Sequence, residues 1–144
     1  MLVKQISVFV ENKFGRLSSV LKTLADHNID IIAMCIADTT DFGILRMIVD
    51  QPSEAEKTLK AQGFTVKSTS VIAVAVEDSP GGLSKAIDVL KDTGIIIEYA
   101  YSFAKGCDGN SARAILRVDK PEEAIDAFLK NDVEVLDASH IYEE

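Results

Sequence analysis

Apolar residues follow two periodicities along this chain. Ile6, Val8 and Val10 alternate with Ser7 and Phe9, and residues 72–76 are almost wholly apolar. Both patterns predict strands. Over residues 17–24 and 83–90 the apolar positions recur at i, i+3, i+4 and i+7. This spacing is typical of amphipathic helices that follow the two strands.

The remaining elements also occur in pairs. Apolar patterns predict two strands after each helix, at about 30–38 and 43–50 and at about 95–104 and 111–119. Pro52 and Pro121 each mark the start of a further helix, because a missing N–H costs little in the first turn. A short strand is expected to end each half, near 64–70 and 133–141. Each half therefore has the predicted order βαββαβ.

The two halves are copies of one another. With a shift of 66 residues, nine positions between Val10 and Ile31 meet identical residues, and with a shift of 69 six more match between Val49 and Val66. The change in shift coincides with the turn-like residues 105–110, which indicates a hairpin insertion in the second copy. We expect two domains, residues 1–70 and 71–144.

The order βαββαβ is that of the split ferredoxin-like unit. The predicted class is α+β: two ferredoxin-like units, each an antiparallel sheet with its helices on one face. A unit of about 70 residues has only a marginal core. Each sheet also leaves edges and a face to be covered, so we expect a homodimer.

Composition and charge exclude several classes of protein. No apolar run approaches a membrane span, and the first residues do not form a signal peptide, so a cytoplasmic protein without membrane contact is expected. The net charge is -8, and residues 71–144 carry all of the acidic excess. Without a basic stripe, nucleic-acid binding is not expected. The two cysteines, Cys35 and Cys107, are interpreted as free thiols.

Val10–Ser18 reads VENKFGRLS and Val76–Ser84 reads VEDSPGGLS. We call these strand-to-helix turns the first and second elbow. The elbow pattern Glu-Asn-x-x-Gly-x-Leu, together with Asn28–Ile31 after the first helix, resembles ACT domains, the small-molecule-sensing modules of amino-acid metabolism. The resemblance covers the chain as two ACT units.

The resemblance implies a regulatory protein that binds a free amino acid, usually where two ACT units meet. It places the ligand contacts in the elbow and at the start of the second strand, with Asn12, Gly15 and Asp30 at the family's main positions. The candidate ligand-binding residues are Asn12, Lys13, Phe14, Gly15, Arg16, Leu17, Asp30, Ile31, Asp78, Pro80, Gly81, Gly82 and Leu83. In the second copy Asp78 replaces Asn12 and Ile96 replaces Asp30, so the first elbow is the expected site.

The elbow also has a physical reason to hold an amino acid. Unpaired N–H groups and the dipole at a helix start stabilise a carboxylate, and glycines allow the backbone to approach a ligand. Asn12 can both donate and accept hydrogen bonds. Asn12 has an alternative role, however, as a cap of the turn before the helix. Lys13 and Arg16 have the alternative role of surface charges.

Three functions remain open. The first is an amino-acid sensor that acts through a partner protein, a metabolic enzyme or a regulator. The second is a non-catalytic interaction or regulatory subunit of a biosynthetic enzyme, comparable to that of acetolactate synthase, with a vestigial ligand site. The third is a small enzyme that uses Cys107. The chain has no G-x-S-x-G, P-loop or GxGxxG motif and no metal-ligand spacing, so we expect no catalysis, cofactor or metal.

Overall fold

The computed structural model describes residues 1–38, 41–103 and 111–142. Contacts divide the chain into two compact units. The first unit comprises Lys4–Thr69 with the last residues from Ile141, and the second comprises Ser70–His140 with Met1–Val3. The predicted hairpin insertion at 105–110 and Cys107 lie outside the described residues.

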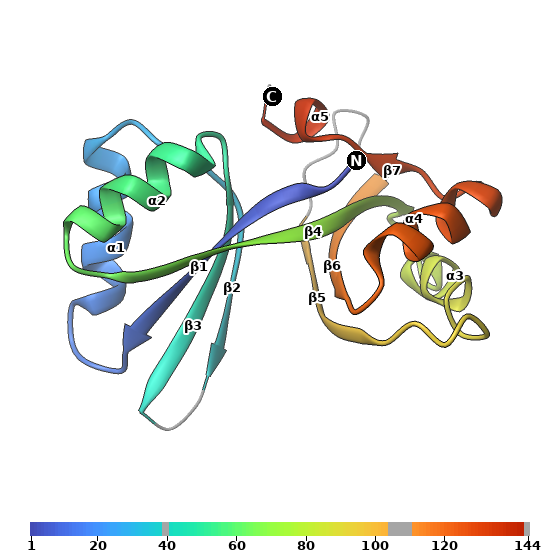
Figure 1. Ribbon diagram of the computed structural model, residues 1–144, viewed down its shortest axis with the longest axis horizontal. Coiled ribbons are helices and arrows are strands. Elements are labelled where there is room, and N and C mark those ends of the chain that lie inside the picture. Colours follow the sequence, from blue (N-terminus) through green and yellow to red (C-terminus); the bar gives the residue numbers. More distant parts are fainter. Residues whose placement is uncertain (39–40, 104–110, 143–144) are drawn as a thin grey trace. The chain divides into compact units, whose positions relative to one another are not determined.

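The first unit has the predicted order of strands and helices (Figure 1). Its elements are β1 (Val3–Glu11), α1 (Arg16–Asp26), β2 (Ile31–Asp38), β3 (Phe42–Val49), α2 (Pro52–Ala61) and the first part of β4 (Thr65–Glu77). The strand order is β2-β3-β1-β4, with β3 antiparallel to both β1 and β2. Both helices lie on one face of this sheet (Figure 1). Ile6, Val8, Leu45 and Met47 pack beneath them with Val20 and Leu24 of α1.

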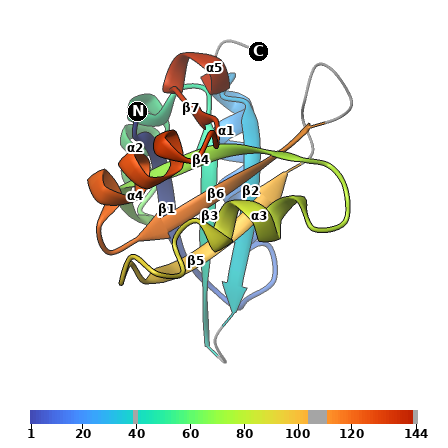
Figure 2. The same ribbon diagram turned by 90° about the vertical axis from the view of Figure 1, so that its right-hand side faces the viewer.

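The second unit repeats this arrangement. It contains the second part of β4, then α3 (Gly82–Asp88), β5 (Ile97–Phe103), β6 (Ser111–Val118), α4 (Pro121–Lys130), β7 (Val135–Leu136) and α5 (Ala138–Tyr142). The strand order is β7-β4-β6-β5, and α3 and α4 lie on one face of the sheet (Figure 2). The core beneath them includes Ile72, Val74, Leu116 and Phe128. The α+β class, with two ferredoxin-like units, is therefore confirmed.

The predicted strand near 133–141 is wrong in its second half. Strand β7 contains only Val135 and Leu136, and the short helix α5 follows it. Asp137 begins this turn, because its carbonyl accepts the N–H of His140 at 3.1 Å and its own N–H donates to His140 Nδ1 at 3.3 Å. Tyr142 then donates its hydroxyl to the Lys4 carbonyl and accepts the Lys4 N–H. The hydrogen-bonded turn at Asp137 and the burial of Ile141 thus override the alternating pattern.

The repeat extends to single hydrogen bonds. The Asp50 carboxylate accepts the backbone N–H of Asp30 at 2.9 Å, and the Asp119 carboxylate accepts that of Ile96 at 2.8 Å. In both units this aspartate follows the third strand and fixes the residue just before the second strand. The matching Asp50 and Asp119 are therefore explained by the same hydrogen bond, from the carboxylate to the backbone N–H before the second strand of each unit.

Candidate functional site

The two elbows have the same backbone. Gly15 and Gly81 stand at the N-caps of α1 and α3 with φ of 78° and 88°, a left-handed conformation that favours glycine. In each elbow the residue four positions later donates its N–H to the glycine carbonyl, at 2.9 Å for Ser19 and 3.0 Å for Lys85. These glycines are accounted for by conformation alone.

No side chain caps the start of α1. The alternative role of Asn12, as a cap of the turn before the helix, stays a prediction. The Asn12 backbone N–H donates to the carbonyl of Asp41 at 3.1 Å, which joins the elbow to the start of β3. The Arg16 N–H donates to the Lys13 carbonyl at 3.3 Å, and the dipole of α1 favours an anion beside Gly15.

A cavity of about 560 Å³ lies beside the first elbow. This volume is in the usual range for small-molecule sites. The cavity extends from the elbow to the helix-covered face of the sheet, between the end of β1, the first turn of α1 and the strands β2 and β3. It is lined by Val10, Glu11, Asn12, Lys13, Phe14, Leu17, Ile36, Gly43 and Leu45. We call it the elbow cavity.

Gly43 of β3 helps to keep the elbow cavity open. It pairs with Val10 across the sheet, so a side chain at this position would point to the helix-covered face. A Cβ placed on Gly43 would lie 3.3 Å from Cγ2 of Ile36 and 3.7 Å from Oδ1 of Asn12. The amide of Asn12 and the side chain of Ile36 therefore meet over this glycine.

A charge pair stands at the loop end of the elbow cavity. The ammonium of Lys13 lies 2.9 Å from Oε2 of Glu11. The hydrogen bond and the charge of Lys13 lower the pKa of the exposed Glu11 carboxyl below its ordinary value. Glu11 is thus ionised at neutral pH, and the loop offers one cation and one anion within reach of a zwitterion.

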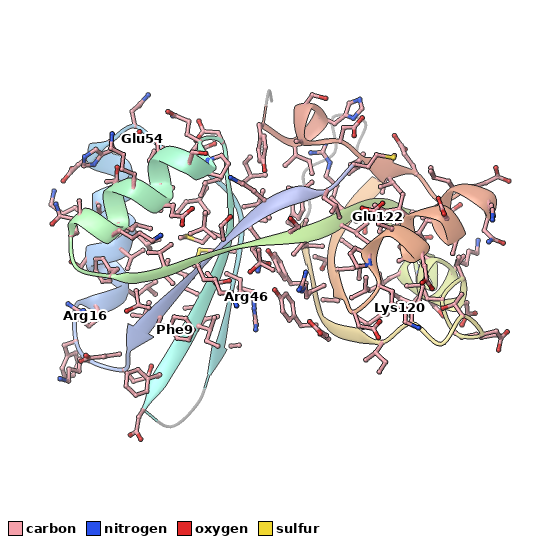
Figure 3. All side chains as sticks on the ribbon, viewed as in Figure 1. Phe9, Arg16, Arg46, Glu54, Lys120 and Glu122 are labelled. Atoms are coloured by element: carbon pink, nitrogen blue, oxygen red, sulfur yellow. The ribbon has the colours of Figure 1, made fainter. Side chains whose placement is uncertain are left out.

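Arg16, labelled in Figure 3, is the first residue of α1 and contacts an aromatic side chain. Its guanidinium lies over the ring of Phe64, 5.0 Å from the ring centroid. Phe64 precedes β4, and its ring belongs to the core beneath the helices. Arg16 does not line the elbow cavity, so the cation nearest to a ligand there is Lys13.

The second elbow is closed by its own strand. A Cβ on Gly82 would overlap the carbonyl oxygen of Glu77 at the end of β4. Gly82 therefore lets α3 approach β4, which is a packing reason for this glycine apart from the predicted approach of a ligand. Glu77, the counterpart of Glu11, has its partner on the helix, with Lys85 Nζ 3.6 Å from Oε2.

The space beside the second elbow is also smaller. A cavity of about 210 Å³ lies between α3, the end of β4 and the loop after α4. Its lining contains Glu77, Gly82 and Lys85 but not Ser102, Ala112 or Ala114, the counterparts of Ile36, Gly43 and Leu45. The candidates Asp78, Pro80, Gly81 and Leu83 do not line it either.

Asp30 lies at the other end of the first sheet from Asn12. Ile31, at the start of β2, pairs with Val49, whereas Gly43 at the far end of β3 pairs with Val10. Six residues along a strand correspond to about 20 Å. Asp30 lines a separate cavity of about 340 Å³ with Asn28 and Asp50. Asp30 and Asn12 of one unit therefore do not meet at one ligand, and Ile31 packs against the core instead.

The sequence interpretation missed the strand residues that form the walls of the elbow cavity. Val10, Ile36, Gly43 and Leu45 lie in segments that the apolar pattern predicts only as strands. A signal was present in the repeat, because Ile36 and Leu45 match the smaller Ser102 and Ala114. The structure gives both pairs the same register, Ile36 opposite Leu45 and Ser102 opposite Ala114. Differences in size at matched positions marked the unit with the larger cavity.

Two further observations concern the described residues. Within these ranges no three His, Cys, Asp or Glu side chains are grouped so that they could hold a metal ion. None of the described helices is long and apolar enough to span a membrane.

The fold is a pair of βαββαβ units with a cavity beside the first elbow, and comparison with known proteins identifies its family. Residues 1–143 match the family described as ACT domain pair, and the chain belongs to this family. No curated protein matches the sequence.

Solved structures extend the comparison. Protein BT0572 from Bacteroides thetaiotaomicron is 41% identical, with a TM-score of 0.93 over 100% of this chain and 98% of that one. The regulatory subunit of aspartate kinase from Thermus thermophilus has a TM-score of 0.64 at 17% identity, over 90% of this chain and 93% of its own. That from Thermus flavus has a TM-score of 0.63 at 18% identity, over 98% and 92%. The aspartate kinase subunits share the fold.

Proposed function

We propose that this protein is a regulatory amino-acid sensor, which binds a free α-amino acid in the elbow cavity and transmits its occupancy to a partner protein. The observation that carries the proposal is the elbow cavity itself: about 560 Å³ bounded by the amide of Asn12, the Lys13–Glu11 pair and the first turn of α1. The α-carboxylate is stabilised by Lys13 and the helix start, and the α-ammonium by Glu11.

A sensor of this kind requires a ligand that prefers one state of the protein. The size of the response is limited by the difference in affinity between the two states. The partner is proposed to be a metabolic enzyme or a regulator, in a cytoplasmic setting. The Thermus relatives that share the fold are regulatory subunits of aspartate kinase, which supports a partner of the enzyme type.

A second copy of the chain is part of the proposal. Asp30 is about 20 Å along the sheet from the elbow cavity of its own unit. A ligand in this cavity can therefore contact an Asp30 side chain only if a second copy of the chain provides it. We therefore propose a homodimer. Sedimentation equilibrium measures the mass directly, and a monomer at every concentration tested would remove Asp30 from the proposed site.

A thermal-shift and calorimetric screen against the twenty amino acids tests the sensor function. A ligand at 100 times its Kd stabilises the folded state by about 2.7 kcal/mol. Asn12→Ala should weaken binding at least tenfold, whereas Asp78→Ala at the matched position of the second elbow should leave it unchanged. Equal effects of the two substitutions would contradict a site at the first elbow.

The alternative is a regulatory subunit without a working ligand site. This chain covers 93% and 92% of the two Thermus aspartate kinase regulatory subunits, which favours this alternative as the second candidate. This alternative predicts no binding of any amino acid at millimolar concentration, together with a stable complex with an enzyme. The same screen therefore separates the two candidates.

A further inference from the structure

The walls of the elbow cavity bear on which amino acid it accepts. We infer, on the basis of the proposed function, that the ligand is an α-amino acid with a bulky apolar side chain. The inference rests on three features of the first unit: the kind of side chain on the walls, the position of the polar groups, and the room made by Gly43.

The walls are apolar on every side that faces away from the loop. Val10 of β1, Leu17 of α1, Ile36 of β2 and Leu45 of β3 come from four different elements and line the same space. Val10 and Leu45 are buried in the core and Leu17 packs against it, whereas Ile36 is 48% exposed. Ile36 therefore presents an uncovered apolar surface to the cavity, which an apolar ligand side chain would cover.

The polar groups of the cavity are all in three consecutive residues. Glu11, Asn12 and Lys13 supply the only charged or amide side chains among the described residues that line it. A zwitterion uses this set fully, because the Lys13 ammonium and Glu11 carboxylate match its two charges. A polar ligand side chain directed at the walls would then lose its water without gaining a hydrogen bond, which is unfavourable.

The room for the side chain comes from Gly43. Its missing Cβ leaves free the space between Ile36 Cγ2 and Asn12 Oδ1, where the polar and apolar parts of the cavity meet. The second unit has Ala112 here, with Ser102 and Ala114 in place of Ile36 and Leu45. The first unit thus has both the open position and the larger apolar walls.

Phe14 gives the ligand a further apolar contact. It lines the mouth of the elbow cavity, and its side chain is fully exposed. Aromatic rings are stabilised by packing on other apolar groups. We expect the Phe14 ring to pack against the bound side chain.

Calorimetry on the complete chain with glycine, alanine, valine, leucine and phenylalanine tests the inference, with asparagine as the polar match for leucine. Each buried methylene should tighten binding about fourfold, so leucine should bind about 50-fold more tightly than alanine. Asparagine should bind at least tenfold more weakly than leucine. Asparagine binding as tightly as leucine would overturn the apolar class and leave amino-acid binding intact.

The acid 4-methylpentanoate, which is leucine without its ammonium group, separates the two proposals. It should bind at least tenfold more weakly than leucine, because it lacks the ammonium group that the Glu11 carboxylate is proposed to bind. Equal binding would overturn the requirement for an amino acid while keeping an apolar site. If none of these compounds binds, this inference is overturned, and the screen against the twenty amino acids decides separately whether the sensor function fails.

Two variants locate the effect. Gly43→Val should weaken leucine binding at least tenfold, and Ala112→Val at the matched position of the second unit should leave it unchanged. Should Gly43→Val not fold, Ile36→Ser at a half-exposed position should weaken leucine binding about tenfold and alanine binding little. Unchanged leucine affinity in a folded Gly43→Val or in Ile36→Ser would overturn the inference.

Discussion

Beside the first elbow lies a cavity of about 560 Å³, whereas the cavity beside the second elbow, where α3 rests on the end of β4, is about 210 Å³. Gly15 and Gly81 give both turns the same shape, with φ of 78° and 88°. The residue after each glycine differs: Arg16 turns away onto Phe64, whereas Gly82 lets α3 rest on the Glu77 carbonyl. One duplicated turn thus supports two packings, and among the described residues the larger of the two cavities lies beside the first elbow.

The backbone conformation of an elbow does not by itself create a ligand site, since both elbows share it. What distinguishes the first unit is the set of side chains around the turn, mainly Ile36, Gly43 and Leu45 on the neighbouring strands. The second unit keeps the turn and the core but has smaller residues on β5 and β6. Its helix can approach the sheet more closely because Gly82 has no Cβ. The second unit then serves stability or partner contact under the proposed function.

The largest expected effect is that of Gly82→Ala. The added Cβ overlaps the Glu77 carbonyl, so α3 must move away from β4, and overpacking of this kind costs about 3 kcal/mol of the free energy of unfolding. Urea denaturation followed by circular dichroism measures it. Arg16→Ala at the matched position should cost only about 1 kcal/mol, the usual size of a cation–π contact. Equal losses would mean that the two elbows are packed alike.

Gly15→Ala and Gly81→Ala should each lower the free energy of unfolding by less than Gly82→Ala, and by equal amounts. Both glycines have positive φ, and nothing lies within 4 Å of an added Cβ, so only the strain of the left-handed conformation remains. That strain costs about 1.5 kcal/mol of the free energy of unfolding at each site. The same denaturation experiment applies. A difference greater than the error would contradict the common backbone of the two elbows.

The sequence predicted most of the fold because the repeat and the apolar periodicity are local signals. The helices after Pro52 and Pro121 begin at those residues, and the two strands expected around residue 70 are one continuous strand, β4. The end of the chain was not predicted, since the turn at Asp137 depends on the burial of Ile141. Periodicity alone does not report such a contact.

The candidate site was predicted only in part, for a physical reason. Asn12, Lys13, Phe14 and Leu17 line the elbow cavity, and these are the residues that a local motif can identify. The walls come from β2 and β3, which meet the elbow only through sheet register. Asp30 was grouped with the elbow by family position, although β2 begins at the far end of the sheet. Gly82 was assigned to a ligand because its close approach to Glu77 is a tertiary contact.

Both units contain the same hydrogen bond between an aspartate and the residue before the second strand, which provides a further test. Asp50→Ala and Asp119→Ala each remove this hydrogen bond to the backbone N–H. Each should cost about 1 kcal/mol of the free energy of unfolding, since this is the net value of a typical hydrogen bond. Thermal denaturation of the two variants measures the losses. A loss of stability in only one variant would show that the two hydrogen bonds do not contribute equally, although the aspartates match in the repeat.

The smallest effect concerns the charge pair of the first elbow. Lys13 lowers the pKa of Glu11 from its ordinary value of 4.5, so ionised Glu11 favours the folded state above that value, and this contribution is lost as the pH falls through the lowered pKa. Because Glu11 stays ionised above pH 5, its titration should change neither stability nor leucine binding between pH 5 and 8. A carbon-detected NMR titration should show the Glu11 pKa rising toward 4.5 in Lys13→Ala, because the hydrogen bond and the charge are both removed. Lys85→Ala, which removes the helix-borne partner of Glu77, should leave the titration of Glu11 unchanged. An unchanged Glu11 pKa in Lys13→Ala would mean that the pair at 2.9 Å does not persist in solution, and that the loop does not hold its charges ready for a zwitterion.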